Sequence, residues 1–414
     1  MGISSLVPIA AMAEFKAGVA TAIVTPDPLL PVSGGVGTPE PANTKQGELE
    51  VRALVLEQGD TRVAMVSAPF LGFPGVLCDK VRAQVKGIQP ENVIIGATHT
   101  HSAPDMYAFP DGKGGTMADL GYIERVCKDT AEAINRALAN LQPAGVKIAE
   151  GEAAEQIAYN YYAPQLYDRR CSVMQFTGKD GKAIATLVNY AIHPEVLGPD
   201  QGILSPDMVG PLYERIAAQG GGVGVFMNGA QGGMVTADCR GADGKDVQTW
   251  DECHRIGHLL ADEALRLVSA APLQADPALF CAAKKVAFPI ESEMMLAIVK
   301  GSPLGFPVSE KNEAVTQVNV VNVGTAQILT IPGEALPNIG FYLKRNMKGS
   351  QHFLFGLTND AFGYILTKVD FNSFERYNYI SRTSLGEMTG EIYITEALKF
   401  AGECPAPQAA APAG

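Results

Sequence analysis

The sequence has few of the residues that mark several large classes of protein. Tryptophan occurs once, histidine six times, and charged residues make up only 18% of the 414 positions. Runs of lysine and arginine are missing and the net charge is −12, so we do not expect a nucleic-acid partner. No apolar run approaches the roughly 20 residues that a transmembrane helix requires. The composition therefore leaves globular enzymes and binding proteins as the classes to consider.

Cysteines are also few, and they lack the spacing of a structural metal site. Seven are scattered along the chain, an odd number. Cys239 and Cys253 flank a polar loop and could be bridged in an oxidising compartment, although free buried thiols are the commoner state of such residues.

The N-terminal segment allows two interpretations. Ile3–Ala13 resembles the end of a signal peptide with an Ala-x-Ala cleavage site, but it lacks a charged leader. Residues 1–14 are therefore either a signal-peptide remnant or a frayed terminus. The first interpretation predicts a secreted or periplasmic protein, and the second predicts a cytoplasmic one.

The sequence does contain enough apolar residues, 47%, to bury a large core. Strand-hairpin and amphipathic-helix patterns alternate along the chain, over 49–66, 117–141, 171–190, 251–268 and 315–331. This alternation predicts an α/β fold, with a layered mixed β-sheet core and flanking helices. The Pro- and Ala-rich segment 403–414 is expected to be a disordered tail.

The stretch NVIIGATHTHSAPD, Asn92–Asp105, carries the strongest functional signal. A buried-strand pattern at Val93–Ile95 ends shortly before His99 and His101. Residues i and i+2 of an extended segment share a face, so both imidazoles can enter one cleft beyond the strand end. The alternative is a pair of loop histidines bonded to backbone.

Other predicted strands also end in polar residues. These are His193, Asn228–Thr236, Glu334 and Asp360–Tyr364. Distant segments that end at one edge of a sheet can form a single cleft. Two histidines and one carboxylate suit zinc, with a position left for water or substrate. Bound zinc lowers the pKa of water and polarises a carbonyl group, so the pattern favours a metal-assisted hydrolase with its site at strand ends.

Two features allow more than one interpretation. His254 and His258 lie four residues apart on a predicted helix, but the segment lacks the glutamate of the metalloprotease motif, so we interpret them as surface residues. Glu195 follows His193 by two residues. It is either a base or metal neighbour in the same cleft, or a solvated loop residue.

Five segments in the order THTHSAPD, NYAIHPE, GAQGGMVTAD, IPGEALP and GLTNDAFGYILT resemble the catalytic domain of the neutral ceramidases. The resemblance spans residues 15–402. It implies a zinc-dependent amidohydrolase that acts on a small-molecule or lipid-like acyl substrate. It also implies that four residues hold the zinc ion: His99, His193, Glu334 and Tyr364.

The resemblance assigns roles to further residues and also shows departures. His101 would transfer a proton or hold the oxyanion, and Tyr377 would steady the substrate carbonyl. Thr236 stands where the family uses a serine, so a hydroxyl group persists there. Asn160-Tyr161 stands where an Asn-Arg pair is expected, and the arginine is absent.

We therefore predict a zinc-dependent hydrolase that cleaves the amide bond of a ceramide-like or other acyl-amide substrate by metal-activated water. A zinc-dependent esterase or lactonase is an alternative, because the same activated water attacks esters more readily. A degenerate, non-catalytic ligand-binding protein is another, motivated by the missing arginine and serine. No sequence feature separates the amidase from the esterase or lactonase, whereas the presence of all four implied zinc positions argues against a degenerate site. The sequence gives no oligomeric state.

Overall fold

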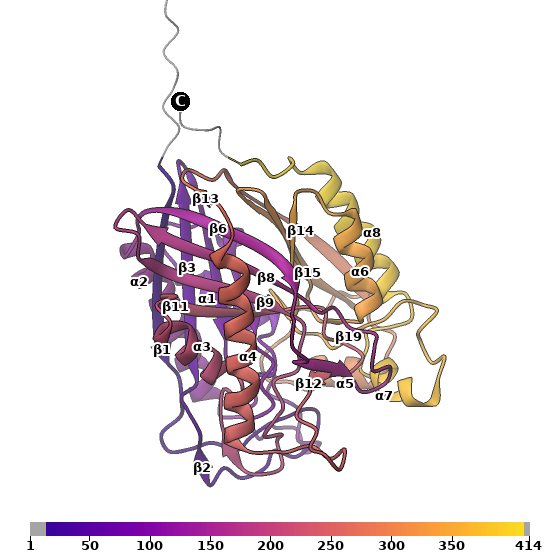
Figure 1. The fold of residues 1–414 in the computed structure, drawn as a ribbon. Coiled ribbons are helices and arrows are strands. Elements are labelled where there is room, and N and C mark those ends of the chain that lie inside the picture. The colour runs from indigo at the N-terminus through magenta and orange to yellow at the C-terminus, as the bar shows by residue number, and fades with distance from the viewer. Residues whose placement is uncertain (1–13, 410–414) are drawn as a thin grey trace, which may run out of the picture.

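Two β-sheets packed face to face form the centre of the molecule (Figure 1). The structure is a computed structural model, and it describes residues 14–409. Within these residues the larger sheet has nine strands in the order β11-β9-β8-β6-β1-β3-β4-β5, with β13 beside β6. The smaller sheet has the order β14-β15-β16-β18. Both sheets are mixed, since the pairs β4–β5, β9–β11 and β16–β18 are parallel and their other neighbours are antiparallel.

The strands of the larger sheet are β1 (Lys16–Ile23), β3 (Glu50–Gln58), β4 (Thr61–Ala68), β5 (Val93–Ala97), β6 (Gln142–Glu152), β8 (Arg170–Gly178), β9 (Ala183–Tyr190), β11 (Val223–Asn228) and β13 (Leu273–Gln274). Those of the smaller sheet are β14 (Leu279–Pro289), β15 (Glu313–Val323), β16 (Ala326–Thr330) and β18 (Gln351–Phe355). Three short pairs lie outside both sheets: β2 (Thr44–Lys45) with β10 (Ile203–Leu204), β7 (Ala158–Asn160) with β12 (Val235–Ala237), and β17 (Glu334–Ala335) with β19 (Tyr364–Ile365).

The main core lies between the facing sheets. Alternate residues of each strand point inward, so Leu54 and Phe176 of the larger sheet belong to the same buried cluster as Val321 and Phe353 of the smaller one. All four side chains are fully buried. Burial of this kind stabilises each sheet only when the other is present, because one apolar face covers the other.

Helices cover the outer face of each sheet. On the larger sheet, α1 (Gly75–Arg82) and α2 (Leu120–Ala139) cover one half, and α3 (Val209–Ala218) and α4 (Trp250–Ser269) cover the other. The smaller sheet is covered by α5 (Glu293–Gly301), α6 (Pro337–Asn346) and α8 (Thr389–Glu403), with the short α7 (Asn378–Arg382) nearby. The order of layers is thus helix, sheet, sheet, helix, and the predicted α/β class is confirmed.

The helix ends show where local sequence was informative. Asp119 caps α2 by accepting a hydrogen bond from Tyr122 N, and Thr249 caps α4 in the same way. Ser205 does not cap α3, because this helix begins only at Val209. Asp207 adopts the left-handed region with φ +55°, and this conformation prevents the helix from starting earlier.

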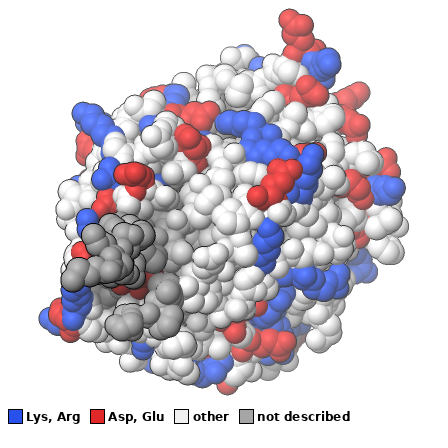
Figure 2. Space-filling view, turned by 90° about the horizontal axis from the view of Figure 1, so that it is seen from above, with Lys and Arg blue, Asp and Glu red and all other residues white. Residues whose placement is uncertain are grey.

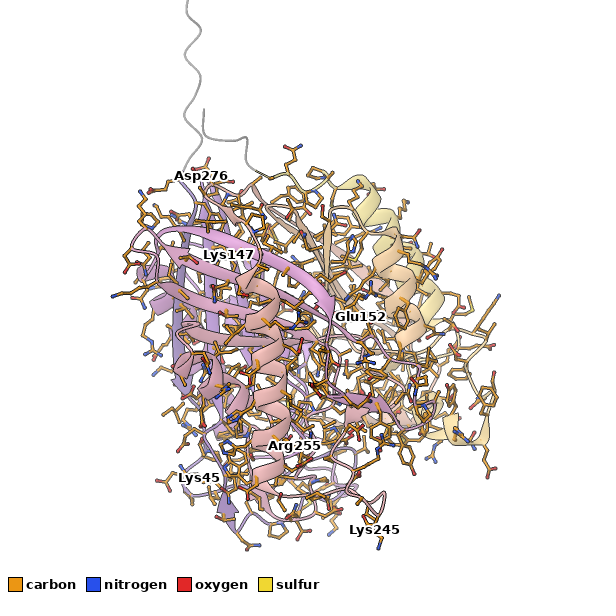
Figure 3. All side chains as sticks on the ribbon, viewed as in Figure 1. Lys45, Lys147, Glu152, Lys245, Arg255 and Asp276 are labelled. Atoms are coloured by element: carbon orange, nitrogen blue, oxygen red, sulfur yellow. The ribbon has the colours of Figure 1, made fainter. Side chains whose placement is uncertain are left out.

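Charged side chains of both signs are mixed on the surface. On the face shown in Figure 2, lysine and arginine alternate with aspartate and glutamate without a large patch of either sign. Arg255, labelled on α4 in Figure 3, pairs with Glu252 and donates to Asp238 O. Among the helices of residues 14–409, none is both long and apolar enough to cross a membrane.

The two terminal segments singled out from the sequence lie partly or wholly outside the residues that the structure describes. The signal-peptide remnant, 1–14, lies outside the described residues apart from Glu14, and so do residues 410–414. The described part of the expected tail packs on the protein, since Cys404 is buried and Asn322 donates to Pro405 O. All seven cysteines are free thiols, including Cys239 and Cys253.

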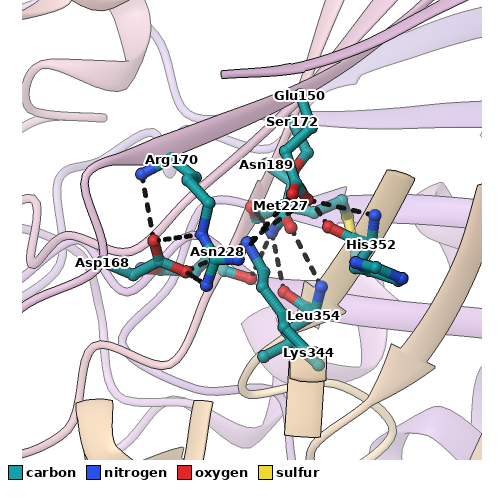
Figure 4. Close-up of polar contacts among 10 residues, drawn as sticks. All are labelled: Glu150, Asp168, Arg170, Ser172, Asn189, Met227, Asn228, Lys344, His352 and Leu354. Atoms are coloured by element: carbon teal, nitrogen blue, oxygen red, sulfur yellow. Dashed lines mark hydrogen bonds and ion pairs between the residues drawn. The ribbon is translucent and has the colours of Figure 1, made fainter. Parts of the chain in front are cut away.

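A buried asparagine joins the two sheets (Figure 4). The amide group of Asn189, on β9, donates to Met227 O at 2.9 Å and to Leu354 O at 2.7 Å, and its oxygen accepts from Leu354 N. Leu354 belongs to β18 of the smaller sheet, so this side chain bonds across the interface. Every polar atom of the amide is satisfied in a dry core, where an unpaired group would be costly.

A second buried group, Lys344 of α6, extends this polar region (Figure 4). Its ammonium lies 3.1 Å from Asp168 and 3.7 Å from Glu150. Burial would raise the pKa of Asp168, but Lys344 and the bidentate Arg170 hold that pKa below its usual range. The ion pairs fix α6 and the loop before β8 against the larger sheet.

We expect Asn189→Leu to destabilise the protein by roughly 2–5 kcal/mol, because it leaves buried carbonyl and N–H groups of β11 and β18 unpaired. Chemical denaturation followed by circular dichroism measures the free energy of unfolding. The control Asn346→Leu changes an exposed residue of α6 and should stay within about 0.5 kcal/mol of wild type. Equal effects of the two substitutions would contradict the role of Asn189.

Asp207 predicts a pH dependence of stability. Burial raises its pKa to about 6, although Leu197 N and Met208 N donate to the carboxylate. The native state therefore binds more protons than the unfolded state between about pH 4 and 6, so stability falls as pH rises through this window. Asp207→Asn should remove this pH dependence. The free energy of unfolding of the variant minus that of wild type should therefore increase by up to about 3 kcal/mol between about pH 4 and 6. A difference that stays constant from pH 4 to 6.5 would contradict it.

Candidate metal centre

A pair of short parallel strands places a carboxylate opposite a tyrosine. Glu334 of β17 pairs with Tyr364 of β19, and both are buried. Glu334 N donates to Gly363 O, and Tyr364 N donates to Thr383 O. Gly363 has φ +92°, and a Cβ there would lie 2.1 Å from Thr383 O, so the close approach requires glycine.

His99 follows the end of β5 in an uncommon conformation. Its φ is +73°, a value that non-glycine residues adopt mainly where the surrounding structure enforces it. The backbone N–H donates to Phe70 O, and ring Nδ1 lies 2.6 Å from Leu71 O. That carbonyl can only accept, so Nδ1 carries the hydrogen and a neutral His99 presents a lone pair at Nε2.

His193 follows the end of β9 and is fixed by one carbonyl group. Val235 O accepts from its backbone N at 2.8 Å and from ring Nδ1 at 2.7 Å. The same tautomer argument assigns the free lone pair to Nε2. Hydrogen bonds from the distal ring nitrogen to a carbonyl are the usual way in which proteins orient metal-binding histidines.

Asn228, at the end of β11, holds the two histidine-bearing loops together. Its Nδ2 donates to Thr98 O and Ile192 O, and its Oδ1 accepts from Ile192 N. Thr98 and Ile192 directly precede His99 and His193 in the chain. A single fully buried amide therefore sets the spacing between the two loops.

The three imidazoles and Glu334 form one compact group, in which His101 is half-buried and the others are buried. His99, His101 and His193 each offer a ring nitrogen, and these nitrogens lie within 4.8 Å of one another. Glu334 Oε2 lies 3.2 Å from His193 Nε2 and 3.5 Å from His99 Nε2. Among the described residues, no hydrogen-bond partner is found for Glu334 Oε2 or for Nε2 of His193 and His101.

This arrangement fits a metal ion. Lone pairs of neutral His99 and His193 face a carboxylate oxygen without a proton between them, and such unpaired buried groups are costly. A cation bound among them would satisfy all three atoms at once. The nitrogen and oxygen donors are those that zinc and other divalent transition metals take in proteins.

The electrostatics of the group are strongly coupled. Burial would raise the pKa of Glu334, but His99 and His193 hold it well below its usual range when their imidazoles are protonated. Burial lowers the pKa of His193, but the carboxylates of Glu334 and Glu195 raise it above its usual value. Burial lowers the pKa of His101 well below its usual value, and His99 and His193 lower it further. Burial raises the pKa of Tyr364, and the Glu334 carboxylate raises it further.

His101 lies beside the group and contacts a further carboxylate. Its ring centroid is 4.8 Å from that of His99 and 5.7 Å from that of His193. His101 N donates to Pro194 O, and ring Nδ1 lies 3.6 Å from Glu195 Oε2. The predicted proximity of His99, His101, His193 and Glu334 is thus present in the structure.

A largely apolar cavity opens beside the centre. His99, His101, Glu334 and Tyr364 form part of its wall. The rest comes chiefly from α5, the loop that follows it and β15, through Met295, Ile298, Val299, Phe306, Val308 and Val315. A polar section of the wall contains Arg82, whose guanidinium is satisfied by Val93 O, Asn359 and Asp79.

The two predicted catalytic residues Tyr377 and Thr236 lie outside this wall. Tyr377 packs on Tyr162, with ring centroids 5.5 Å apart, whereas Tyr379 lines the cavity and stacks edge-on against Tyr364. Thr236 lies on β12 and forms a backbone bridge with His193. Their assigned roles remain predictions.

Other polar residues singled out from the sequence have structural partners. Asn160 Oδ1 accepts from Tyr162 N and Ala163 N, and so shapes a turn. Asp360 accepts from Gly75 N. His254 and His258 stack on each other on α4, and the described residues contain no group of three metal-ligating side chains there.

The sequence did not predict that Asn228 joins the two histidine loops or that Tyr379 lines the cavity. Asn228 fell within a segment recognised only as polar, and its function depends on carbonyl groups that are distant in the chain. Tyr379 lies two residues after Tyr377, and nothing in the local pattern separates the two. The carbonyls of Leu71 and Val235, which orient the histidines, carry no side-chain signal at all.

Comparisons with known proteins agree with this fold. No protein-family model matches the chain. A crystal structure of neutral ceramidase from Pseudomonas aeruginosa aligns with a TM-score of 0.77 at 17% identity, covering 97% of this chain and 77% of the other. A structure described as ceramidase complexed with C2 aligns equally well, at 16% identity and the same coverage. The chain therefore has the fold of the neutral ceramidases.

Proposed function

We propose that this protein is a zinc-dependent hydrolase that cleaves the amide bond of an acyl-amide substrate, with ceramide-like lipids as the leading candidates. The observation that carries the proposal is the compact group of three imidazoles and Glu334, in which Nε2 of His101, Nε2 of His193 and Oε2 of Glu334 have no hydrogen-bond partners among the described residues. The fold shared with neutral ceramidases supports the same reaction class.

The proposed ligand set is His99, His193, Glu334 and Tyr364. The first three already point their free atoms at one another, and Tyr364 lies opposite Glu334 on the paired strand. When bound, zinc would activate water for attack and polarise the amide carbonyl oxygen. The deeply buried ligand side chains would keep the ion and its ligands in one fixed geometry.

His101 is the proposed proton-transfer residue. Amide hydrolysis adds water oxygen to the carbonyl carbon, breaks the C–N bond and gives a proton to the departing nitrogen. His101 lies on the cavity wall and is not part of the proposed ligand set, so its imidazole is free to take a proton from the water and return it to the amine. Its low pKa favours the neutral form that can accept the proton.

The cavity supports an apolar acyl group as the buried half of the substrate. Apolar side chains of α5 and β15 line it, and they offer no hydrogen bonds to a sugar or a nucleotide. Tyr379 shares the wall with the centre, so it is better placed than Tyr377 to contact a substrate carbonyl. We keep Thr236 as a proposed hydroxyl contributor near His193.

The zinc content of purified protein tests the ligand set. Wild-type protein should hold about one zinc ion per chain, and His193→Ala should hold far less, because a ligand and its lone pair are removed. Elemental analysis by plasma emission measures both. The control His254→Ala changes a half-buried residue of α4 outside the centre and should retain zinc. Full occupancy in His193→Ala would show that the ligand set is wrong.

Hydrolysis of a small panel tests the reaction. We expect chelator-sensitive cleavage of ceramide or another long-chain acyl amide, and a fall of about 10²–10⁴-fold in kcat for His101→Ala with zinc retained. Liquid chromatography of the released fatty acid measures the rate. Cleavage of a matched ester without any amide would indicate an esterase instead, and unchanged amide cleavage in His101→Ala would refute the proton-transfer role.

A further inference from the structure

Glu195 is a carboxylate beside the centre that the proposed mechanism does not use. It follows His193 by two residues, and its N–H donates to His193 O. The preceding residue, Pro194, accepts from His101 N. These bonds fix the backbone of Glu195 against both histidine loops, and its carboxylate lies beside His101.

The carboxylate is partly open to solvent and has no strong cationic partner. Its side chain is 23% exposed, and its nearest basic group is His101 Nδ1 at 3.6 Å. Within residues 14–409 no lysine or arginine forms an ion pair with it. A carboxylate held beside a buried site without compensation imposes a negative field on whatever enters.

Glu195 contacts His101 but is not part of the apolar wall of the cavity. His101 lines the cavity whereas Glu195 does not. His101 is the proposed donor of the proton to the departing nitrogen, so the amine part of a substrate would lie beside His101, where the Glu195 carboxylate is 3.6 Å from its Nδ1. The acyl part would occupy the apolar cavity.

We infer that Glu195 selects the charge of the leaving group: it favours amides whose amine half carries a second, positively charged group, tolerates neutral head groups and excludes carboxylates. This inference rests on the proposed amide hydrolysis. Like charges placed together across a binding site oppose association, and opposite charges favour it. The charge of Glu195 can therefore discriminate between charged head groups without a pocket that fits them. The exposed aromatic ring of Tyr379 is a suitable neighbour for a cation.

Three substrates with one acyl chain test the inference in the zinc-loaded protein: an acylated diamine, an acyl ethanolamine and an acyl glycine. We expect wild-type kcat/KM to fall in that order, by about tenfold or more from first to last. Glu195→Gln should reduce the ratio of kcat/KM between the acylated diamine and the acyl glycine by about tenfold, chiefly through changes in KM. Glu195→Asp should restore most of the discrimination, because it keeps the charge.

Asp200→Asn is the matched control. Asp200 is exposed and lies on the same loop, so this variant has the same net charge as Glu195→Gln and should leave the series unchanged. An equal fall in kcat for all three substrates in Glu195→Gln, with their ratios preserved, would overturn the inference and leave Glu195 as a support for His101 alone.

A binding measurement separates this inference from the proposed function. Calorimetry with a long-chain alkylamine and the matching alcohol needs no turnover, and Glu195→Gln should weaken amine binding by about tenfold and leave the alcohol unaffected. If no amide is cleaved but this difference holds, the proposed function fails and charge selection stands. If amides are cleaved and neither the rates nor the binding depend on charge, charge selection fails alone.

Discussion

A buried carboxylate facing two imidazole lone pairs is the constraint that explains most of this structure. Glu334 is 7% exposed and lies within 3.5 Å of Nε2 of both His99 and His193. Neutral histidines in that tautomer cannot donate to it, so a bound cation or a proton on His193 is needed to satisfy the group. Because these side chains come from three distant segments, bringing them together has an entropic cost.

Contacts with the surrounding structure hold these side chains in place. Two carbonyl groups fix the histidine rings, Asn228 ties their loops, and the β17–β19 pair holds Glu334 against Tyr364. Gly232 lets the loop after β11 approach Glu334, since a Cβ there would lie 2.2 Å from Glu334 O. All these contacts lie at strand ends beside two tightly packed sheets, where the backbone has little freedom to relax.

The same packing divides the site into two chemically different halves. Apolar side chains of the helix layer on the smaller sheet line the cavity, whereas the loop with Glu195 contacts His101 and does not line it. At the position where the resemblance to neutral ceramidases calls for an asparagine and an arginine, Asn160 shapes a turn and Tyr161 is exposed. The fold is therefore shared at 17% identity, whereas the arginine that the resemblance implies is absent from this position.

The sequence by itself determined the α/β class, the hairpins, the long helices α2 and α4, and the set of polar residues that end the strands. Those features depend on periodicity and on short motifs such as THTHS, which are local. Only the tertiary structure decided that Glu334 faces His99 and His193, that Tyr379 and not Tyr377 lines the cavity, and that Glu195 contacts His101. It also revealed the role of Asn228 and the late start of α3 at Val209. These depend on backbone carbonyls and strand register across distant segments, and no local pattern of side chains encodes them.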